Sequence, residues 1–239
     1  MSIPRFYIQD AIPSSGSYSL PDGASHHASR VLRLVEGDAV VLFDGSGKEF
    51  ECRVSQAKKS GMAVEIMGCE EIDRESGVRV TLVQSLCSNE KMDWVVQKAV
   101  ELGAEKIQAV EARRSVVRLS GERARRREEH WRSVAISACE QCGRNVIPEI
   151  PEIVPLDHWV ASGHEGLKLL LSIEGAPFRD FSAPQGNVFV LIGPEGGLTP
   201  EEVHFARSTG FRDAKLGSRI LRTETAGLAA LAAIDCLWG

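Results

Sequence analysis

The sequence has no hydrophobic run long enough to cross a membrane and no excess of basic residues. The longest uncharged run, Thr225–Ile234, has about half the length that a bilayer requires, so we expect a buried helix there and no membrane association. Residues Met1–Phe6 lack an apolar core behind a basic start, which predicts that there is no secretory signal. Six cysteines in a chain without such a signal indicate a reduced, cytoplasmic setting.

A net charge of -5 argues against a uniformly cationic coat for nucleic acid. Local basic patches remain possible, and the segment from Arg113 to Arg132 holds eight arginines against three glutamates. Charge runs of this kind are equally often a solvated helix face whose arginines pair with neighbouring acids. The segment therefore predicts either an RNA-binding patch or such a face.

The first part of the chain has the pattern of a small antiparallel sheet or barrel. Residues 39–67 contain short apolar or alternating stretches at 40–43, 50–54 and 62–66, with a turn at Asp44–Gly47, which predicts a hairpin and a further strand. Residues 25–34 predict a short helix on which Arg30 and Arg33 share a side. The charged stretch Glu70–Gly77 is the best linker candidate. We place the domain boundary there, with a first domain of 1–72 and a second of 73–239.

The second part alternates strands and helices. We expect strands at 78–86, 106–110, 167–173, 188–192 and 214–216, and helices at 90–103, 121–142 and 226–237. The runs 167–173 and 188–192 are too continuously apolar to be half-exposed strands, which is typical of central strands in a parallel sheet. The pattern predicts the α/β class, with helices on both faces of a largely parallel sheet.

Two loops of the second part carry the chemistry. Gly193–Gly197 follows a strand, and Thr199 with Glu202 forms a capping box with Pro200 at the first helical position. Such a loop lies at the carboxyl end of a parallel strand, where open sheets bind ligands. The second loop, Gly217–Arg222, places Ile220 and Leu221 where they could cover a flat apolar group such as adenine. The alternatives are a tight turn for the first loop, and ion pairs of Arg219 and Arg222 with Glu224 or Asp213 for the second.

Other sites are poorly supported. The chain has no G-x-G-x-x-G after the first strand of the second part and no G-x-x-x-x-G-K-[ST], which excludes the usual dinucleotide and P-loop sites. Cys139 and Cys142 with His158 and His164 resemble a zinc spacing, but both cysteines fit inside an amphipathic helix. Nothing places a histidine beside either cysteine as a catalytic base. We expect no metal and no catalytic thiol.

The motifs resemble the SPOUT superfamily of knotted methyltransferases, and within it the RsmE family, which methylates N3 of a uridine in 16S ribosomal RNA. The matching segments run through the whole chain in the order of the family: 27–33, 43–46, 90–103, 139–144, 191–197 and 221–226. The resemblance implies an N-terminal PUA-like β-barrel for RNA, a C-terminal SPOUT domain with a deep trefoil knot, and a homodimer. It also implies S-adenosylmethionine as the cofactor and the small ribosomal subunit as the partner, with neither DNA nor a membrane involved.

The resemblance further assigns roles to single residues. The residues expected to hold the cofactor are Leu171, Ile192, Gly193, Glu195, Gly196, Gly197, Leu216, Ser218, Ile220, Leu221 and Thr223. We expect Arg222 to stabilise the negative charge that develops on uracil, and Glu195 or Glu224 to handle its proton. Charge and position in matching motifs suggest five RNA contacts: Arg5, Arg30, Arg33, Lys91 and Arg144.

Two other functions stay open. A related knotted enzyme could methylate a ribose 2'-hydroxyl or a tRNA base, since the first loop alone does not exclude it. A non-catalytic, ribosome-associated RNA-binding module would use the β-rich first domain alone. Binding of S-adenosylmethionine separates that module from either enzyme.

Overall fold

The computed structural model describes residues 3–58 and 61–239, which form two compact units. Of these residues, the first unit comprises those up to Glu75 together with Cys139–Ile147, and the second comprises Ser76–Ala138 and Pro148–Gly239. The predicted boundary at 72/73 lies near the end of the first segment. The sequence did not indicate that 139–147, which lie far along the chain, would join the first unit.

The first unit is built on a five-stranded sheet with the order β1-β3-β4-β5-β2. Strands β1 and β3 are parallel, and the other neighbours are antiparallel. Its elements are β1 (Arg5–Tyr7), β2 (Gly16–Ser19), α1 (Asp22–His26), β3 (Ala39–Phe43), β4 (Lys48–Lys58) and β5 (Gly61–Glu71). The predicted hairpin and third strand are confirmed, although β4 and β5 are longer than the pattern indicated.

Alternation of side chains creates the core of this unit. In β4, Phe50, Cys52 and Val54 are buried while their neighbours face outward, as a half-buried strand requires. The predicted helix at 25–34 is wrong in its extent. Helix α1 ends at His26, a π-helical turn covers His27–Val31, and Arg33 has a φ of 56°. Because Arg33 lies beyond the helical turns, it does not share a helix face with Arg30.

The second unit contains a six-stranded sheet with the order β11-β9-β10-β6-β7-β8, in which all neighbours are parallel. Its strands are β6 (Val80–Ser85), β7 (Lys106–Glu111), β8 (Val154–Pro155), β9 (Leu167–Pro177), β10 (Val188–Ile192) and β11 (Arg212–Lys215). Its helices are α2 (Asn89–Glu101), α3 (Gly121–Cys142, whose last turn belongs to the first unit), α4 (Leu156–Ala161), α5 (Pro200–Ser208) and α6 (Thr223–Trp238). The predicted α/β class is confirmed.

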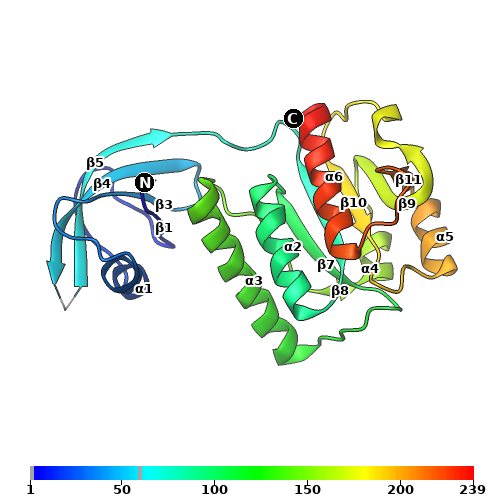
Figure 1. The fold of residues 1–239 in the computed structure, drawn as a ribbon, viewed down its shortest axis with the longest axis horizontal. Coiled ribbons are helices and arrows are strands. Elements are labelled where there is room, and N and C mark those ends of the chain that lie inside the picture. Colours follow the sequence, from blue (N-terminus) through cyan, green and yellow to red (C-terminus); the bar gives the residue numbers. More distant parts are fainter. Residues whose placement is uncertain (1–2, 59–60) are drawn as a thin grey trace. The chain divides into compact units, whose positions relative to one another are not determined.

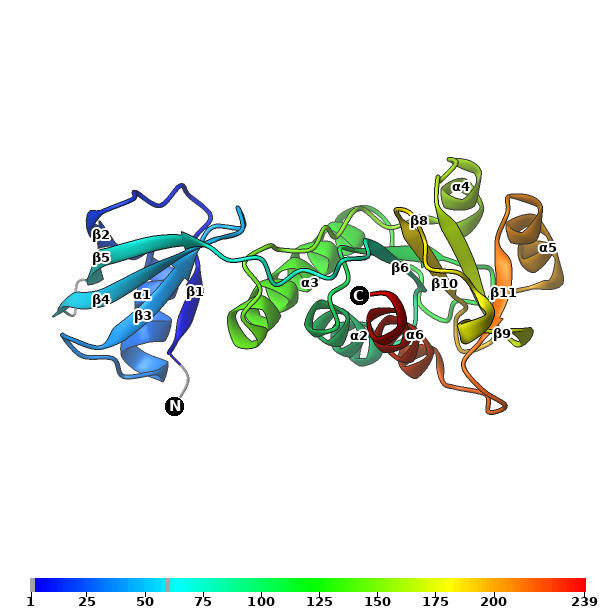
Figure 2. The same ribbon diagram turned by 90° about the horizontal axis from the view of Figure 1, so that it is seen from above.

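Helices cover both faces of this sheet (Figure 1 and Figure 2). One face forms an apolar cluster with α4 and α5 that includes Val83, Leu191 and Trp159. The other face is covered by α6, which packs against β6, β10 and the neighbouring helix α2. A Cβ atom at Gly227 would lie 2.9 Å from Leu82 Cδ1, so glycine allows α6 to approach β6 closely. No helix of the described residues is long and apolar enough to cross a membrane.

Candidate cofactor and active site

A cavity of about 540 Å³ lies at the carboxyl ends of β10 and β11 and beside the middle of β9. Both loops that the sequence singled out contribute to it, because each directly follows one of these parallel strands. This is the edge at which open α/β sheets hold ligands. The structure therefore brings the two predicted loops together into one site.

The carboxyl end of the first loop is fixed by hydrogen bonds at the start of α5. Thr199 caps α5 by accepting a hydrogen bond from the Glu202 N–H, and Glu202 Oε2 accepts one of 2.7 Å from the Thr199 N–H. The second carboxylate oxygen of Glu202 accepts a hydrogen bond of 2.8 Å from the Arg113 N–H. The predicted capping box is confirmed. It also ties the segment after β7 to the start of α5, which fixes the carboxyl side of the loop.

An irregularity in β9 forms a wall of the cavity. Asp213 of β11 pairs with Leu170, but the next residue, Ala214, pairs with Ala176. Residues 171–175 therefore bulge out of the sheet, and 171–173 line the cavity. Strands β9 and β11 can resume pairing after the bulge only with glycine at position 175, because a Cβ there would lie 2.5 Å from the Ala214 nitrogen.

The two loops are joined through the start of α6. The Gln84 side-chain N–H donates a hydrogen bond of 2.8 Å to the Thr223 hydroxyl, which donates one of 2.6 Å to the Gly193 carbonyl oxygen. Thr223 is the first residue of α6, although the sequence placed it in the approach to a helix beginning at 226. Its side chain is buried and lies between the two loops.

A lysine lies between the two carboxylates that the sequence selected for proton handling. Lys91 Nζ is 3.1 Å from Glu195 Oε1 and 3.3 Å from Glu224 Oε2, and all three residues line the cavity. Burial raises the pKa of Glu195, but hydrogen bonds from its own N–H and from Lys91 and Ser88 outweigh this and lower it overall. Hydrogen bonding to Glu195 raises the pKa of Lys91 despite partial desolvation. Both charges are thus stabilised.

Most of the expected cofactor residues meet at this cavity. Nine of the eleven line it: Leu171, Ile192, Gly193, Glu195, Gly197, Leu216, Ile220, Leu221 and Thr223. Ser218 and Gly196 are not among the lining residues. The Gly196 carbonyl instead accepts a hydrogen bond of 3.1 Å from Arg114, and a Cβ there would lie 3.3 Å from the Arg114 side chain. Because Arg114 lies so close, packing favours glycine at position 196.

Sequence reasoning missed several lining residues. They are Leu170, Ser172, Ile173, Pro194, Leu198, Val203, Arg207, Ala214, Lys215, Gly217, Arg219 and Ala226. Seven of the twelve come from β9, α5 and the end of β11. Pro194 and Gly217 lie inside quoted motifs and could have been included. The bulge has no signal in the periodicity of the sequence.

Arg222 is exposed and is the N-cap of α6, the residue before the first helical position. The alternative that Arg219 and Arg222 pair with Glu224 or Asp213 is wrong, because those carboxylates have other partners. Glu224 pairs with Lys91, and Asp213 accepts a hydrogen bond of 3.2 Å from Arg207. Arg219 and Arg222 make no ion pair within residues 3–58 and 61–239.

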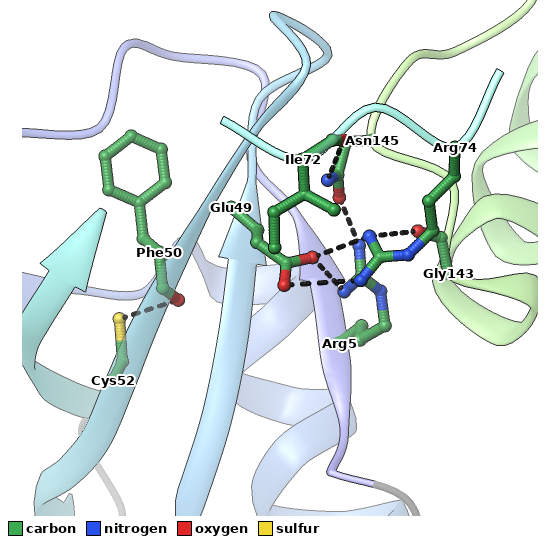
Figure 3. Close-up of polar contacts among 8 residues, drawn as sticks. All are labelled: Arg5, Glu49, Phe50, Cys52, Ile72, Arg74, Gly143 and Asn145. Carbon is green, nitrogen blue, oxygen red and sulfur yellow. Dashed lines mark hydrogen bonds and ion pairs between the residues drawn. The ribbon is translucent and has the colours of Figure 1, made fainter. Parts of the chain in front are cut away.

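The five expected RNA contacts fall into three groups. Arg30 and Arg33 are exposed on the first unit, and Lys91 lines the cavity. Arg5 and Arg144 have only 12% and 6% of their side chains exposed and bind Glu49 and Glu75. Figure 3 shows Arg5 between Glu49 and Asn145. Because carboxylates already hold these two guanidinium groups, the structure does not favour them as phosphate contacts.

Most arginines of the segment from Arg113 to Arg132 pair with acidic side chains or backbone carbonyl groups. Arg118 binds Glu111, Arg126 binds Glu122, and Arg127 lies 3.6 Å from Asp93. Arg132 donates a hydrogen bond of 3.1 Å to the Ile150 carbonyl. No such partner occurs for Arg123 and Arg125 among the described residues, and both are exposed. Within the same part of the chain, no group of three or more His, Cys, Asp or Glu side chains could hold a metal ion.

Comparison with known proteins agrees with the geometry. Residues 74–235 match the model of the RNA methyltransferase domain, and 20–67 match the RNA methyltransferase PUA domain. The ribosomal RNA small subunit methyltransferases E of Bacillus subtilis and Mycobacterium bovis are 30% and 33% identical to the chain. Each alignment covers 97% of this chain. It covers 95% of the Bacillus subtilis protein and 91% of the Mycobacterium bovis protein.

A solved structure is similar over nearly its full length. The ribosomal RNA small subunit methyltransferase E from Neisseria gonorrhoeae, bound to S-adenosylmethionine, shares 38% identity and a TM-score of 0.92. The match covers 99% of this chain and 98% of that one. The expected family is confirmed: the chain belongs to the RNA methyltransferases with an N-terminal PUA domain, and within them to the family of the ribosomal RNA small subunit methyltransferases E.

Proposed function

We propose that this protein transfers a methyl group from S-adenosylmethionine to N3 of a uridine in the 16S RNA of the small ribosomal subunit. The observation that carries the proposal is the meeting of loops 193–197 and 216–222 around one cavity with apolar walls and carboxylates. Relatives that match nearly the whole chain carry the name of this rRNA methyltransferase. Acting on ribosomal RNA, the protein would work in the cytoplasm.

The residues of the cavity suit the cofactor. Its volume of about 540 Å³ falls in the range of roughly 300–1,000 Å³ that is usual for small-molecule sites. Leu171, Ile192 and Leu221 offer apolar surface for an adenine ring, and the glycines expose backbone groups. Ile220 lines the cavity but is 80% exposed, so a ligand would cover it. Glu195 and Glu224 supply negative charge for a cationic ligand.

The chemistry assigns different tasks to the charged residues. When bound, S-adenosylmethionine supplies an electrophilic methyl group. Uracil N3 must lose its proton to become a good nucleophile, and a carboxylate, Glu195 or Glu224, accepts that proton. Negative charge then spreads onto uracil O2 and O4, and the Arg222 guanidinium stabilises it. Arg222 is suited to this role because it lines the cavity without an ion pair among the described side chains.

RNA recognition is assigned to the first unit and to the cavity edge. Arg30 and Arg33 are exposed and would contact phosphates, which gives affinity without sequence selectivity. Selection of one uridine then depends on the shape of the RNA around an extruded base.

The finer topology and assembly belong to the same proposal. We propose that the first sheet closes into a PUA-like barrel, which the register shifts in β4 support by bending that strand. We also propose a deep trefoil knot, because α6 returns from the β11 edge to pack against the central strands β6 and β10. A homodimer would cover apolar side chains left exposed on the second unit, including Trp94, Ile173 and Leu237.

The test is direct. Purified protein is incubated with small subunits that lack the modification, with naked 16S RNA and with S-adenosylmethionine, and the methylated nucleosides are mapped by mass spectrometry. We expect 3-methyluridine at one position. A 2'-O-methylated ribose would replace the proposal with the related knotted enzyme. If no methylation occurs and a calorimetric titration detects no cofactor binding, the alternative of a non-catalytic RNA-binding module is favoured.

A further inference from the structure

We propose that Lys91 is a positioning residue that holds Glu195 and Glu224 side by side in the cavity and keeps the acid that accepts the uridine proton ionised. The proposal rests on the proposed function. It changes the role that the sequence suggested for this lysine, which was a contact with RNA. The ammonium group lies between the two carboxylates instead of pointing away from the site.

Lys91 connects three segments that are distant in the sequence. It lies in the first turn of α2, whereas Glu195 belongs to the loop after β10 and Glu224 to the first turn of α6. The Ser88 N–H, just before α2, lies 3.5 Å from the same Glu195 oxygen that Lys91 contacts. The start of α2 therefore fixes the position of Glu195 through both a backbone group and a side chain.

The two neighbouring carboxylates, Glu195 and Glu224, require a positive charge between them. Two carboxylates in one partly buried cavity repel each other, and without a cation one of them tends to take up a proton. Lys91 has 27% of its side chain exposed, while Glu195 and Glu224 have 29% and 16% exposed. Water therefore screens the three charges only in part. With Lys91 in place the pKa of Glu195 is lowered, so this acid stays ionised, as a proton acceptor must be.

Other charged groups around the three residues do not replace the lysine. The cationic side chains that also line the cavity are Arg207, Lys215, Arg219 and Arg222. Arg207 is bound to Asp213 outside the acid pair. Burial, followed by the charge of Glu195, raises the pKa of the Cys87 thiol to about 12, so it stays neutral. Within the described residues, Lys91 is the cation that forms ion pairs with both carboxylates.

The experiment compares Lys91→Met and Lys91→Arg with Lys98→Met as a matched control. Lys98 lies on the same helix and forms an ion pair with Glu101 at 2.8 Å, away from the cavity. The pKa of Glu195 is measured in the cofactor-free protein by ¹³C NMR of labelled glutamate, with Glu195→Gln for assignment. Cofactor affinity and the pH dependence of kcat on small subunits are then measured for each variant. Thermal unfolding is checked first, and Lys91→Gln replaces Lys91→Met if the latter does not fold.

We expect Lys91→Met to raise the pKa of Glu195 and to lower kcat at neutral pH by about 100-fold, the usual effect of misplacing a reacting group. The acid limb of its pH profile should move to higher pH, because Glu195 then stays protonated to a higher pH. Lys91→Arg should recover most of both properties, and Lys98→Met should match the wild type.

An unchanged Glu195 pKa together with wild-type kcat in Lys91→Met would overturn the proposal. So would a loss confined to RNA affinity with a smaller salt dependence, because Lys91 would then be a phosphate contact. If the wild-type protein does not methylate at all, the proposed function fails. The carboxyl titration still decides in that case whether Lys91 holds the acid pair.

Discussion

The Thr223 hydroxyl donates a hydrogen bond of 2.6 Å to the carbonyl oxygen of Gly193. The two residues are 30 positions apart: Gly193 begins the loop after β10, and Thr223 begins α6, directly after the loop that follows β11. The same hydroxyl accepts a hydrogen bond from Gln84 of β6, so a central strand supports the junction. The cavity between the loops therefore depends on one buried hydroxyl group.

Thr223→Val should weaken the junction while keeping the side-chain shape. It removes the donor to Gly193 and the acceptor for Gln84, which leaves two buried polar groups without this partner and costs about 1–3 kcal/mol of unfolding free energy. Cofactor affinity, measured by calorimetry, should fall because the loops are no longer joined. Thr223→Ser is the control, since it keeps the hydroxyl. Equal cofactor affinity in Thr223→Val and the wild type would show that the loops hold their geometry independently.

Arg222→Ala should abolish methylation and leave cofactor binding within a few-fold. A donor that stabilises developing negative charge usually contributes about 10²- to 10³-fold to the rate. Arg222→Lys should retain part of the activity because it keeps the charge but not the planar guanidinium. Single-turnover methylation of small subunits gives the rates. Loss of cofactor binding in Arg222→Ala would instead identify Arg222 as part of the cofactor site.

The exposed and the buried arginines should behave differently in RNA binding. Replacing Arg30 and Arg33 together by Ala should weaken binding to a 16S RNA fragment and reduce its salt dependence by about one slope unit for each lost phosphate contact. Arg5→Ala should mainly lower the stability of the first unit, because Arg5 pairs with Glu49. Fluorescence anisotropy at several salt concentrations tests both. If binding is insensitive to salt, phosphate contacts do not govern it.

Glu49 should make the stability of the first unit depend on pH. Burial raises its pKa, but hydrogen bonds from Arg74 and Arg5 outweigh this and lower it from 4.5 to about 2. A lowered pKa means that this stabilisation is complete above pH 4.5 and disappears as the pH falls through about 2. Glu49→Gln should therefore cost about 2 kcal/mol at pH 7 and progressively less below pH 4.5.

Urea unfolding at several pH values, followed by a probe in the first unit, measures this difference. Glu51→Gln is a suitable control, because Glu51 lies two residues along the same strand and is exposed. A Glu49→Gln deficit that stayed constant from pH 7 to pH 3 would show that shape, not charge, makes Glu49 important.

The sequence by itself determined the features that depend on local physics. The sequence predicted a helix at about 121–142, where α3 lies, and the residues Thr199, Pro200 and Glu202 predicted the start of α5. Both are decided within a few residues of chain, by side-chain periodicity and by capping hydrogen bonds. The two loops of the candidate site were found for a similar reason, since each directly follows a strand, the first with glycines and the second with two apolar residues.

Only the tertiary structure decided what depends on partners distant in the chain. It placed Lys91 between Glu195 and Glu224, gave Arg5 and Arg144 carboxylate partners, and joined 139–147 to the first unit. It also produced the bulge at 171–175, which builds a wall of the cavity. A charged residue can satisfy its charge with any suitable partner that the fold brings near. Its residue type therefore shows that a partner is needed, while the packing of strands and helices decides which one it has.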